Sequence, residues 1–205
     1  MKPYEVASFD ALERIEAEGL QWRPIRRRFG IRAFGTNAYA ADRAGDLVIE
    51  EHTEGTGHEE LYLVVEGRAQ FTLDGESIDA PQGTLVFIRE PEVKRVARAE
   101  EPGTTVLAVG GWVGRAFEPS RWEVFYTAYS RTEAGDFAGA LELMHQGLAE
   151  RPDDPVLLYH LACIQGRAGK REEALATIRR ALELRPDLAE RAREDEDLAA
   201  ISDEL

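Results

Sequence analysis

The chain has 205 residues, of which 43% are hydrophobic and 31% charged, and its formal net charge is −14. This composition is typical of a globular protein with one large or two small domains, and the negative charge disfavours nucleic-acid partners. No apolar run approaches the roughly 18 residues of a membrane-spanning helix, which argues against a membrane partner. With one cysteine, Cys163, and no secretory signal pattern, the sequence predicts a cytoplasmic protein without an intrachain disulfide.

The N-terminal segment SFDALERIEAEG (8–19) is typical of a short amphipathic helix, with Ser8 as its N-cap and Gly19 as its stop. Phe9, Leu12 and Ile15 would share one face of this helix. The next segment, RPIRRRFGIR (23–32), holds five arginines. It is interpreted either as a solvated, salt-bridged segment or as a patch for an anionic ligand or a docking partner.

Between residues 34 and 113, short β-rich runs are separated by Gly and Pro. This pattern predicts a β-sandwich or barrel. LDGE (73–76) is a hairpin signal between two of these runs. The runs are FGTNAYA (34–40), DLVIEEH (46–52), EELYLVV (59–65), AQFTL (69–73), GTLVFI (83–88), VKRVARA (93–99) and TTVLAVGGWV (104–113).

After residue 120, where Ser120 is a candidate N-cap, the pattern becomes helical and repeats with a spacing of 34 residues. GLAERPDD (147–154) aligns with ALELRPDL (181–188) at this spacing, and the same offset pairs Gly135 with Gly169 and Ala140 with Ala174. A period of 34 with two helices per unit resembles the tetratricopeptide repeat. The resemblance implies two repeats, at about 121–154 and 155–188, and a capping helix within 187–205. Such repeats serve as protein-binding scaffolds, and a structural or dimerising role stays equally open.

Spacings in the β-rich half resemble the two motifs of the cupin superfamily over about residues 35–112. Glu60 and Gly67 match the end of the first motif, and Gly75, Pro81 and Gly83 match the start of the second. The resemblance implies a double-stranded β-helix barrel. The predicted fold class is therefore α+β multidomain: an all-β cupin-like barrel over 1–118, followed by all-α helical hairpins over 119–205.

The metal ligands of that family are largely missing. The histidine of the second motif falls at Val86, and no register places a His-x-His pair in the first motif, so only Glu60 remains. We therefore favour a barrel without metal or other cofactor. Its interior would hold a small ligand, with Glu60, Tyr62, Phe71, Phe87 and Trp112 as candidate wall residues, although core packing is the simpler role for the apolar ones.

An alternative metal site stays open, because residues two apart on a strand share a face. Glu50, His52, His58 and Glu60 would then offer two imidazoles and two carboxylates to zinc, iron or manganese. A register slip of one residue would turn Glu50 and His52 outward.

The sequence thus predicts a non-catalytic protein with a ligand-binding or dimerising barrel and a protein-interaction module. The alternative is a metal-dependent cupin enzyme of the dioxygenase or isomerase type. The ligand, the protein partner and a homodimeric state stay open.

Overall fold

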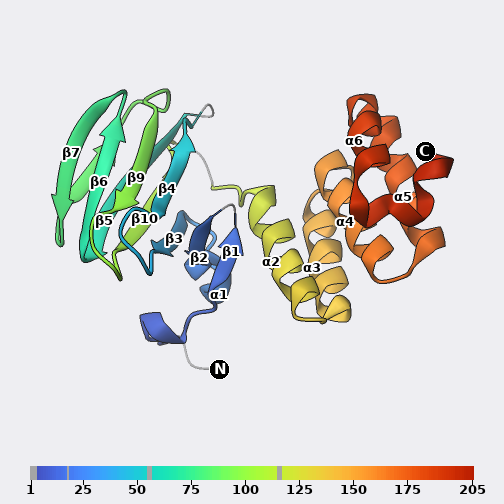
Figure 1. Ribbon diagram of the computed structural model, residues 1–205, viewed down its shortest axis with the longest axis horizontal. Coiled ribbons are helices and arrows are strands. Elements are labelled where there is room, and N and C mark those ends of the chain that lie inside the picture. The colour runs from blue at the N-terminus through green and yellow to red at the C-terminus, as the bar shows by residue number, and fades with distance from the viewer. Residues whose placement is uncertain (1–3, 18, 55–56, 115–116) are drawn as a thin grey trace. The chain divides into compact units, whose positions relative to one another are not determined.

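The computed structural model describes residues 4–17, 19–54, 57–114 and 117–205. The chain divides into two compact units, residues 1–119 and residues 120–205. The first unit is rich in strands and the second is helical (Figure 1). Among the described residues, no helix is both long and apolar enough to cross a lipid bilayer.

The first unit contains ten strands, one short α-helix, α1 (Ile25–Phe29), and a 3₁₀ turn, η1 (Phe9–Ala11). The strands are β1 (Ile15–Ala17), β2 (Leu20–Arg23), β3 (Gly35–Ala40), β4 (Leu47–His52), β5 (His58–Glu66), β6 (Arg68–Leu73), β7 (Glu76–Pro81), β8 (Leu85–Ile88), β9 (Arg95–Ala99) and β10 (Thr105–Trp112).

These strands form two antiparallel sheets. One sheet has the order β1-β2-β3-β10-β5-β8, and the other has the order β4-β9-β6-β7. The chain crosses repeatedly from one sheet to the other, so neighbours within a sheet are often distant in the sequence. This is the arrangement of a double-sheet jelly roll, the architecture of cupins. The predicted barrel is thus a pair of sheets, and no strand pairing between them is seen in the described part of the chain.

The core of this unit lies between the two sheets. Tyr62 on β5 and Phe71 on β6 are buried, and their ring centroids lie 5.7 Å apart. Tyr62 pairs with Val86 of β8 on one side and with Ala108 of β10 on the other. Because cross-strand partners point to the same face, even-numbered residues of these strands face inward and odd-numbered residues face outward.

The predicted hairpin at LDGE joins β6 to β7, with Leu73 opposite Glu76. Asp74 and Gly75 have φ values of 47° and 88°. Two consecutive positive φ angles are those of a type I′ turn, whose twist matches that of the flanking strands. This part of the fold follows directly from the local sequence.

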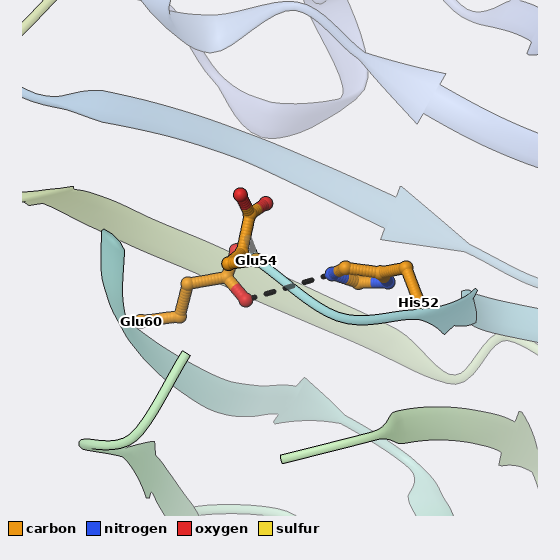
Figure 2. Close-up of side chains that lie close together, drawn as sticks. All are labelled: His52, Glu54 and Glu60. Carbon is orange, nitrogen blue, oxygen red and sulfur yellow. Dashed lines mark ion pairs between the residues drawn. The ribbon is translucent and has the colours of Figure 1, made fainter. Parts of the chain in front are cut away.

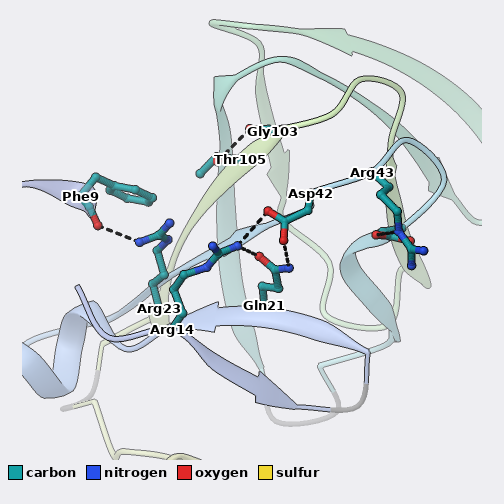
Figure 3. A network of polar contacts seen from close by, with 9 residues as sticks. Phe9, Arg14, Gln21, Arg23, Asp42, Arg43, Gly103 and Thr105 are labelled. Carbon is teal, nitrogen blue, oxygen red and sulfur yellow. Dashed lines mark hydrogen bonds and ion pairs between the residues drawn. The ribbon is translucent and has the colours of Figure 1, made fainter. Parts of the chain in front are cut away.

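The predicted helix over 8–19 is wrong, because Ile15 and Trp22 instead face each other across a β1–β2 hairpin. Ile15 and Trp22 are buried in that arrangement, so the sheet hides apolar surface that a three-turn helix would leave partly exposed. On the exposed side, Arg14 and Gln21 both contact the Asp42 carboxylate, at 3.0 and 2.7 Å (Figure 3).

Arginines of the arginine-rich segment contact other groups of the same unit. Arg23 donates to the Phe9 carbonyl at 2.9 Å, and Arg26 donates to the Ile31 carbonyl at 3.2 Å (Figure 3 shows the first of these). Both side chains are buried. Arg28 forms an exposed ion pair with Glu5 at 2.9 Å.

The second unit consists of helical hairpins followed by shorter helical turns: α2 (Arg121–Glu133), α3 (Phe137–Glu150), α4 (Pro155–Arg167), α5 (Arg171–Leu184), η2 (Pro186–Leu188), α6 (Ala189–Glu194) and η3 (Glu196–Glu204). The turns inside the two hairpins use Gly135 and Gly169, with φ values of 79° and 72°. Ala140 and Ala174 are fully buried. Ser120 occupies the N-cap position of α2, but its side chain makes no capping hydrogen bond.

The capping segment is not one continuous helix, because it bends at Asp195 between α6 and η3. Asp195 accepts hydrogen bonds from the Tyr159 hydroxyl at 2.7 Å and from the Asp197 amide at 3.0 Å. Leu198 and Ile201 of η3 join the core made by α4 and α5. The segment therefore closes the exposed end of the second hairpin.

Candidate functional site

The end of β4 brings an imidazole to the polar cluster of the jelly roll. Glu51 is exposed and pairs with Lys94 at 2.6 Å, whereas Glu50 and His52 are partly buried where β4 shifts register against β9. From there, the Nε2 atom of His52 lies 3.6 Å from the Glu60 carboxylate on β5 (Figure 2). The register thus places His52 on the same side as Glu60.

Glu60 is the centre of the polar cluster. Its Oε2 atom accepts a hydrogen bond from the Tyr62 hydroxyl at 2.5 Å and lies 3.5 Å from Nε of Arg95 on β9. Burial alone would raise the pKa of Glu60, but His52, Tyr62 and Arg95 outweigh it and hold this pKa below its usual value. Glu60 therefore stays ionised inside the jelly roll.

Arg95 is the buried cation of this site. Its side chain is 0% exposed, and its Nη1 atom donates to the Pro91 carbonyl at 3.3 Å. Its Nε and Nη2 atoms donate no hydrogen bond to any described residue. A guanidinium stays protonated in proteins, so a permanent positive charge lies beside Glu60.

The imidazole of His52 is oriented by the backbone of its own strand. Nδ1 lies 2.9 Å from the Glu50 carbonyl, which only accepts, so Nδ1 carries a proton. In a neutral ring, the lone pair of Nε2 then faces the Glu60 carboxylate, and these two acceptors repel each other. A second proton on the ring, or a cation between the two groups, removes this repulsion. Burial opposes the charged ring, but Glu60 and Glu50 together raise the pKa of His52.

His58, at the start of β5, belongs to an aromatic group at the same end of the sheet. Its ring stacks on Trp112, with centroids 5.0 Å apart, and Phe117 lies beside both. Its Nδ1 atom is 3.6 Å from the Glu54 carboxylate. Gly110 makes room for this packing, because a Cβ atom there would lie 3.0 Å from Nε2 of His58.

Three residues of the site were missed by the sequence prediction: Glu54, Arg95 and Gly110. Glu54 lies in the segment after β4, which offers no strand periodicity to predict its direction. Arg95 had a usable signal, because it alternates with Ala97 and Ala99, whose small side chains indicate a buried face. The motif comparison instead drew attention to Val86, which is buried opposite Tyr62.

The candidate metal ligands are only partly brought together. Ligand atoms of His52, Glu54 and Glu60 lie within 4.8 Å of one another. His58 contacts Glu54, and Glu50 contributes its carbonyl to His52. One imidazole and two carboxylates suit a divalent ion, but Arg95 does not.

The charge of Arg95 opposes a divalent ion at this cluster. Two unit charges 4 Å apart interact by about 4 kcal/mol at an effective dielectric constant near 20. A divalent ion bound to Glu60 would face that repulsion twice over, from a guanidinium only 3.5 Å from the carboxylate. The guanidinium therefore weakens a metal site that the carboxylates of Glu54 and Glu60 would otherwise favour.

The five candidate wall residues have different surroundings. Tyr62 and Phe71 pack on each other in the core, and Glu60 faces the interior. Trp112 stacks with His58. Phe87 is 48% exposed and faces outward, because it pairs with the outward Leu61; it does not line the interior.

A second group of ligand-type side chains lies in the helical unit, where Cys163, Asp195 and Asp197 lie within 4.8 Å of one another. Asp195 is already held by Tyr159, and Asp197 lies 3.7 Å from Arg167. Burial raises the pKa of Cys163, so the thiol stays protonated. This group ties η3 to α4 and is structural.

Comparisons with known proteins agree with this architecture. The family model of the tetratricopeptide repeat matches residues 131–194. A cupin protein from Bacteroides fragilis is 22% identical over 60% of this chain and 94% of its own, with a TM-score of 0.45. KdgF from Halomonas is 18% identical over 50% and 88%, with a TM-score of 0.41. No match was found among curated proteins.

A predicted oxalate decarboxylase from Thermotoga maritima is 16% identical over 53% of this chain and all of its own, with a TM-score of 0.44. At these identities and TM-scores, the likenesses carry no information on activity. The strand order and the matched repeat are the stronger observations. The chain thus joins a jelly roll of the cupin type to a helical unit built on the tetratricopeptide repeat.

Proposed function

We propose that this protein is a non-catalytic binding protein. Its jelly-roll unit would hold a small polar ligand at the cluster of His52, Glu60 and Arg95. Its helical unit would bind a protein partner, as tetratricopeptide repeats do in general. The observation that carries the proposal is the fully buried Arg95 guanidinium beside Glu60.

Arg95 supports ligand binding for two reasons. It neutralises Glu60, so the carboxylate needs no metal ion to remain buried. It also leaves Nε and Nη2 without a hydrogen bond in the described part of the chain, and buried donors of this kind generally find an acceptor. A ligand oxygen would satisfy Nη2.

The ligand should combine oxygen acceptors with hydroxyl or ammonium donors. Arg95 would bind the acceptor, and the carboxylates of Glu60 and Glu54 would accept from the donors. Since these two carboxylates surround one permanent cation, a fully anionic ligand is disfavoured. A neutral polyhydroxyl compound or a zwitterion fits this balance of charges.

Thermal unfolding with ligand panels tests the proposal. The panels would be monosaccharides, as polyhydroxyl probes, and α-amino acids, as zwitterions. At least one compound should raise the Tm of the wild type and of Lys94→Gln but not of Arg95→Gln. Lys94→Gln is the matched control, because it removes the same charge from an exposed neighbour that pairs with Glu51.

A stabilising compound that acts equally on Arg95→Gln would contradict this assignment, as would the absence of any stabilising compound in either panel. Circular dichroism of each variant would establish that the fold is retained. Because both variants remove one positive charge, any difference between them reports the effect of the position of that charge.

The second candidate function is that of a metal-dependent enzyme, and the cluster of His52, Glu54 and Glu60 favours it. Under this alternative, purified protein carries zinc, iron or manganese, and the double change His52→Ala and His58→Ala abolishes metal uptake. Unchanged metal content in that double variant would rule the alternative out.

A further inference from the structure

The outer face of the larger sheet carries an apolar surface that grows more exposed toward one edge. Two cross-strand rows run through it: Val109, Leu61 and Phe87, and Leu107, Leu63 and Leu85. At the β3 end of these rows, Thr36 and Ala38 are 5% and 0% exposed. At the β8 end, Phe87 and Leu85 are 48% and 61% exposed.

Strand β8 is the last strand of this sheet, and its sequence, LVFI, is entirely apolar. An open edge of this kind tends to pair with another strand, and proteins normally protect edges with charges, proline or bulges. The other sheet shows such protection, because its edge strand β7 contains Glu76, Asp79 and Pro81. The chain therefore protects one edge and leaves β8 apolar.

The hydrogen-bond alternation shows which groups of β8 are directed outward from the sheet. The amide of Val64 donates to the Thr84 carbonyl, so Thr84, Val86 and Ile88 use their backbone groups toward β5. The N–H and C=O groups of Leu85 and Phe87 then point to the open side. These are the same two residues whose side chains form the exposed end of the apolar rows.

We infer that β8 pairs antiparallel with β8 of a second copy of this chain. A two-fold axis at Val86 places Leu85 opposite Phe87 of the partner, and the reverse, so four backbone hydrogen bonds form. Each Leu–Phe pair lies on the outer face, and the apolar rows continue across the joint. A one-residue shift would set an inward side chain opposite an outward one.

The charge of the chain bears on self-association at this surface. Each copy has a net charge of −14, so two copies repel in general. The outward positions of the two rows and of β8 carry no carboxylate, and the Arg89 guanidinium lies 5.6 Å from the centroid of the Phe87 ring. Pairing along β8 thus brings no carboxylate of these positions against another copy.

Sedimentation velocity of the full chain tests the pairing. The wild type should be a dimer, and Leu85→Lys and Phe87→Lys should be monomers, because an edge lysine blocks strand addition. Val65→Lys is the matched control: Val65 is 38% exposed on the same face but lies on the interior strand β5, so this variant should remain dimeric. A monomeric wild type, or dissociation by Val65→Lys as well, would overturn the inference.

A disulfide tests the register. In a Cys163→Ala background, Val86→Cys should cross-link two chains on oxidation, because non-hydrogen-bonded antiparallel partners have Cα atoms about 4.5 Å apart, within disulfide range. Val113→Cys, at a 72% exposed position outside β8, should not cross-link comparably. A folded Val86→Cys protein that stays monomeric after oxidation would refute the two-fold at Val86. Neither result bears on ligand binding at Glu60.

Discussion

Glu60 and Arg95 determine the charge balance inside the jelly roll. A buried carboxylate is costly unless a partner compensates it, and Arg95, which is 0% exposed, lies 3.5 Å away. His52 adds a proton-dependent contribution on the other side of the carboxylate. The site is therefore an ion-pair cluster whose balance changes when His52 titrates.

Replacing His52 by Gln should remove a pH-dependent part of the folding stability. The pKa of His52 is raised above 6.5 in the fold, because Glu60 and Glu50 outweigh the opposing effect of burial. The native state thus holds the proton more tightly than the unfolded state. This stabilisation is complete below the unfolded pKa and disappears as the pH rises through the raised folded pKa.

Denaturant unfolding of wild type and His52→Gln at about pH 5.5 and about pH 8.5 measures this effect. The stability difference between the two proteins should be larger at the lower pH. Glu60 has a lowered pKa, so its contribution to folding stability depends on pH in the opposite sense. This contribution is lost only as the pH falls below 4.5 and through the pKa of Glu60 in the folded state. A difference between the proteins that is independent of pH would show that His52 is not coupled to Glu60.

Gly110 and Gly111 provide a matched pair of substitutions. A Cβ atom at Gly110 would lie 3.0 Å from both the Glu59 carbonyl and Nε2 of His58, whereas one at Gly111 would meet nothing within 4 Å. Gly110→Ala should therefore destabilise the protein by about 1–3 kcal/mol, as overpacking does. Gly111→Ala should leave the free energy of unfolding unchanged or raise it slightly. Equal effects in urea unfolding would contradict the packing described around His58.

At this scale, the sequence predicted the positions of Glu60, His52 and Glu50 on strands but not Arg95. Strand alternation predicts that Glu50 and His52 share a face, but β4 shifts register against β9 between Ile49 and His52, so only the contact of His52 with Glu60 is seen. The contact between Arg95 and Glu60 joins strands of different sheets, and no local pattern encodes their distance. The motif comparison placed the missing ligand at Val86, whose side chain instead packs in the core.

Among the elements, the repeat helices were predicted best. The turn glycines and the buried alanines both recur at a spacing of 34 residues, so several independent positions indicate the same repeat. The segment over 8–19 was predicted wrongly as a helix. Its apolar residues recur every three positions, but the register opposite β2 buries Ile15 and Trp22 more completely.

Gly166 on α4 tests how closely the capping segment packs. A Cβ atom there would lie 2.2 Å from the Asp197 carbonyl of η3, so the backbone of η3 must move. Alanine normally stabilises an exposed helix position relative to glycine by up to about 1 kcal/mol. Gly166→Ala should nevertheless destabilise the chain by about 1–3 kcal/mol, because overpacking against a backbone outweighs helix propensity. A gain in thermal stability would mean that η3 does not contact α4 as described.

At the scale of the whole molecule, the chain combines two units that each have a core of their own. The jelly roll buries Tyr62, Phe71 and their neighbours between its sheets, and the helical unit buries apolar residues of α2–α5 and η3. The hydrophobic pattern changes near residue 120 from a period of 2 residues, typical of strands, to a period of 3.6 residues, typical of helices. This change predicts both classes of structure. The order of strands in the sheets was available only through the cupin resemblance, because pairing of β3 with β10 spans most of the first unit.

We propose that the charge of Arg95 takes the place of a metal ion beside Glu60. Zinc titration of intact wild type and Arg95→His, by calorimetry and elemental analysis without a metal-affinity tag, tests this proposal. The wild type should bind well below one zinc ion per chain. Arg95→His should bind zinc at least about tenfold more tightly, since one permanent charge is removed and one imidazole is added. Stoichiometric zinc, iron or manganese in the purified wild type, or weaker zinc binding by Arg95→His, would contradict it.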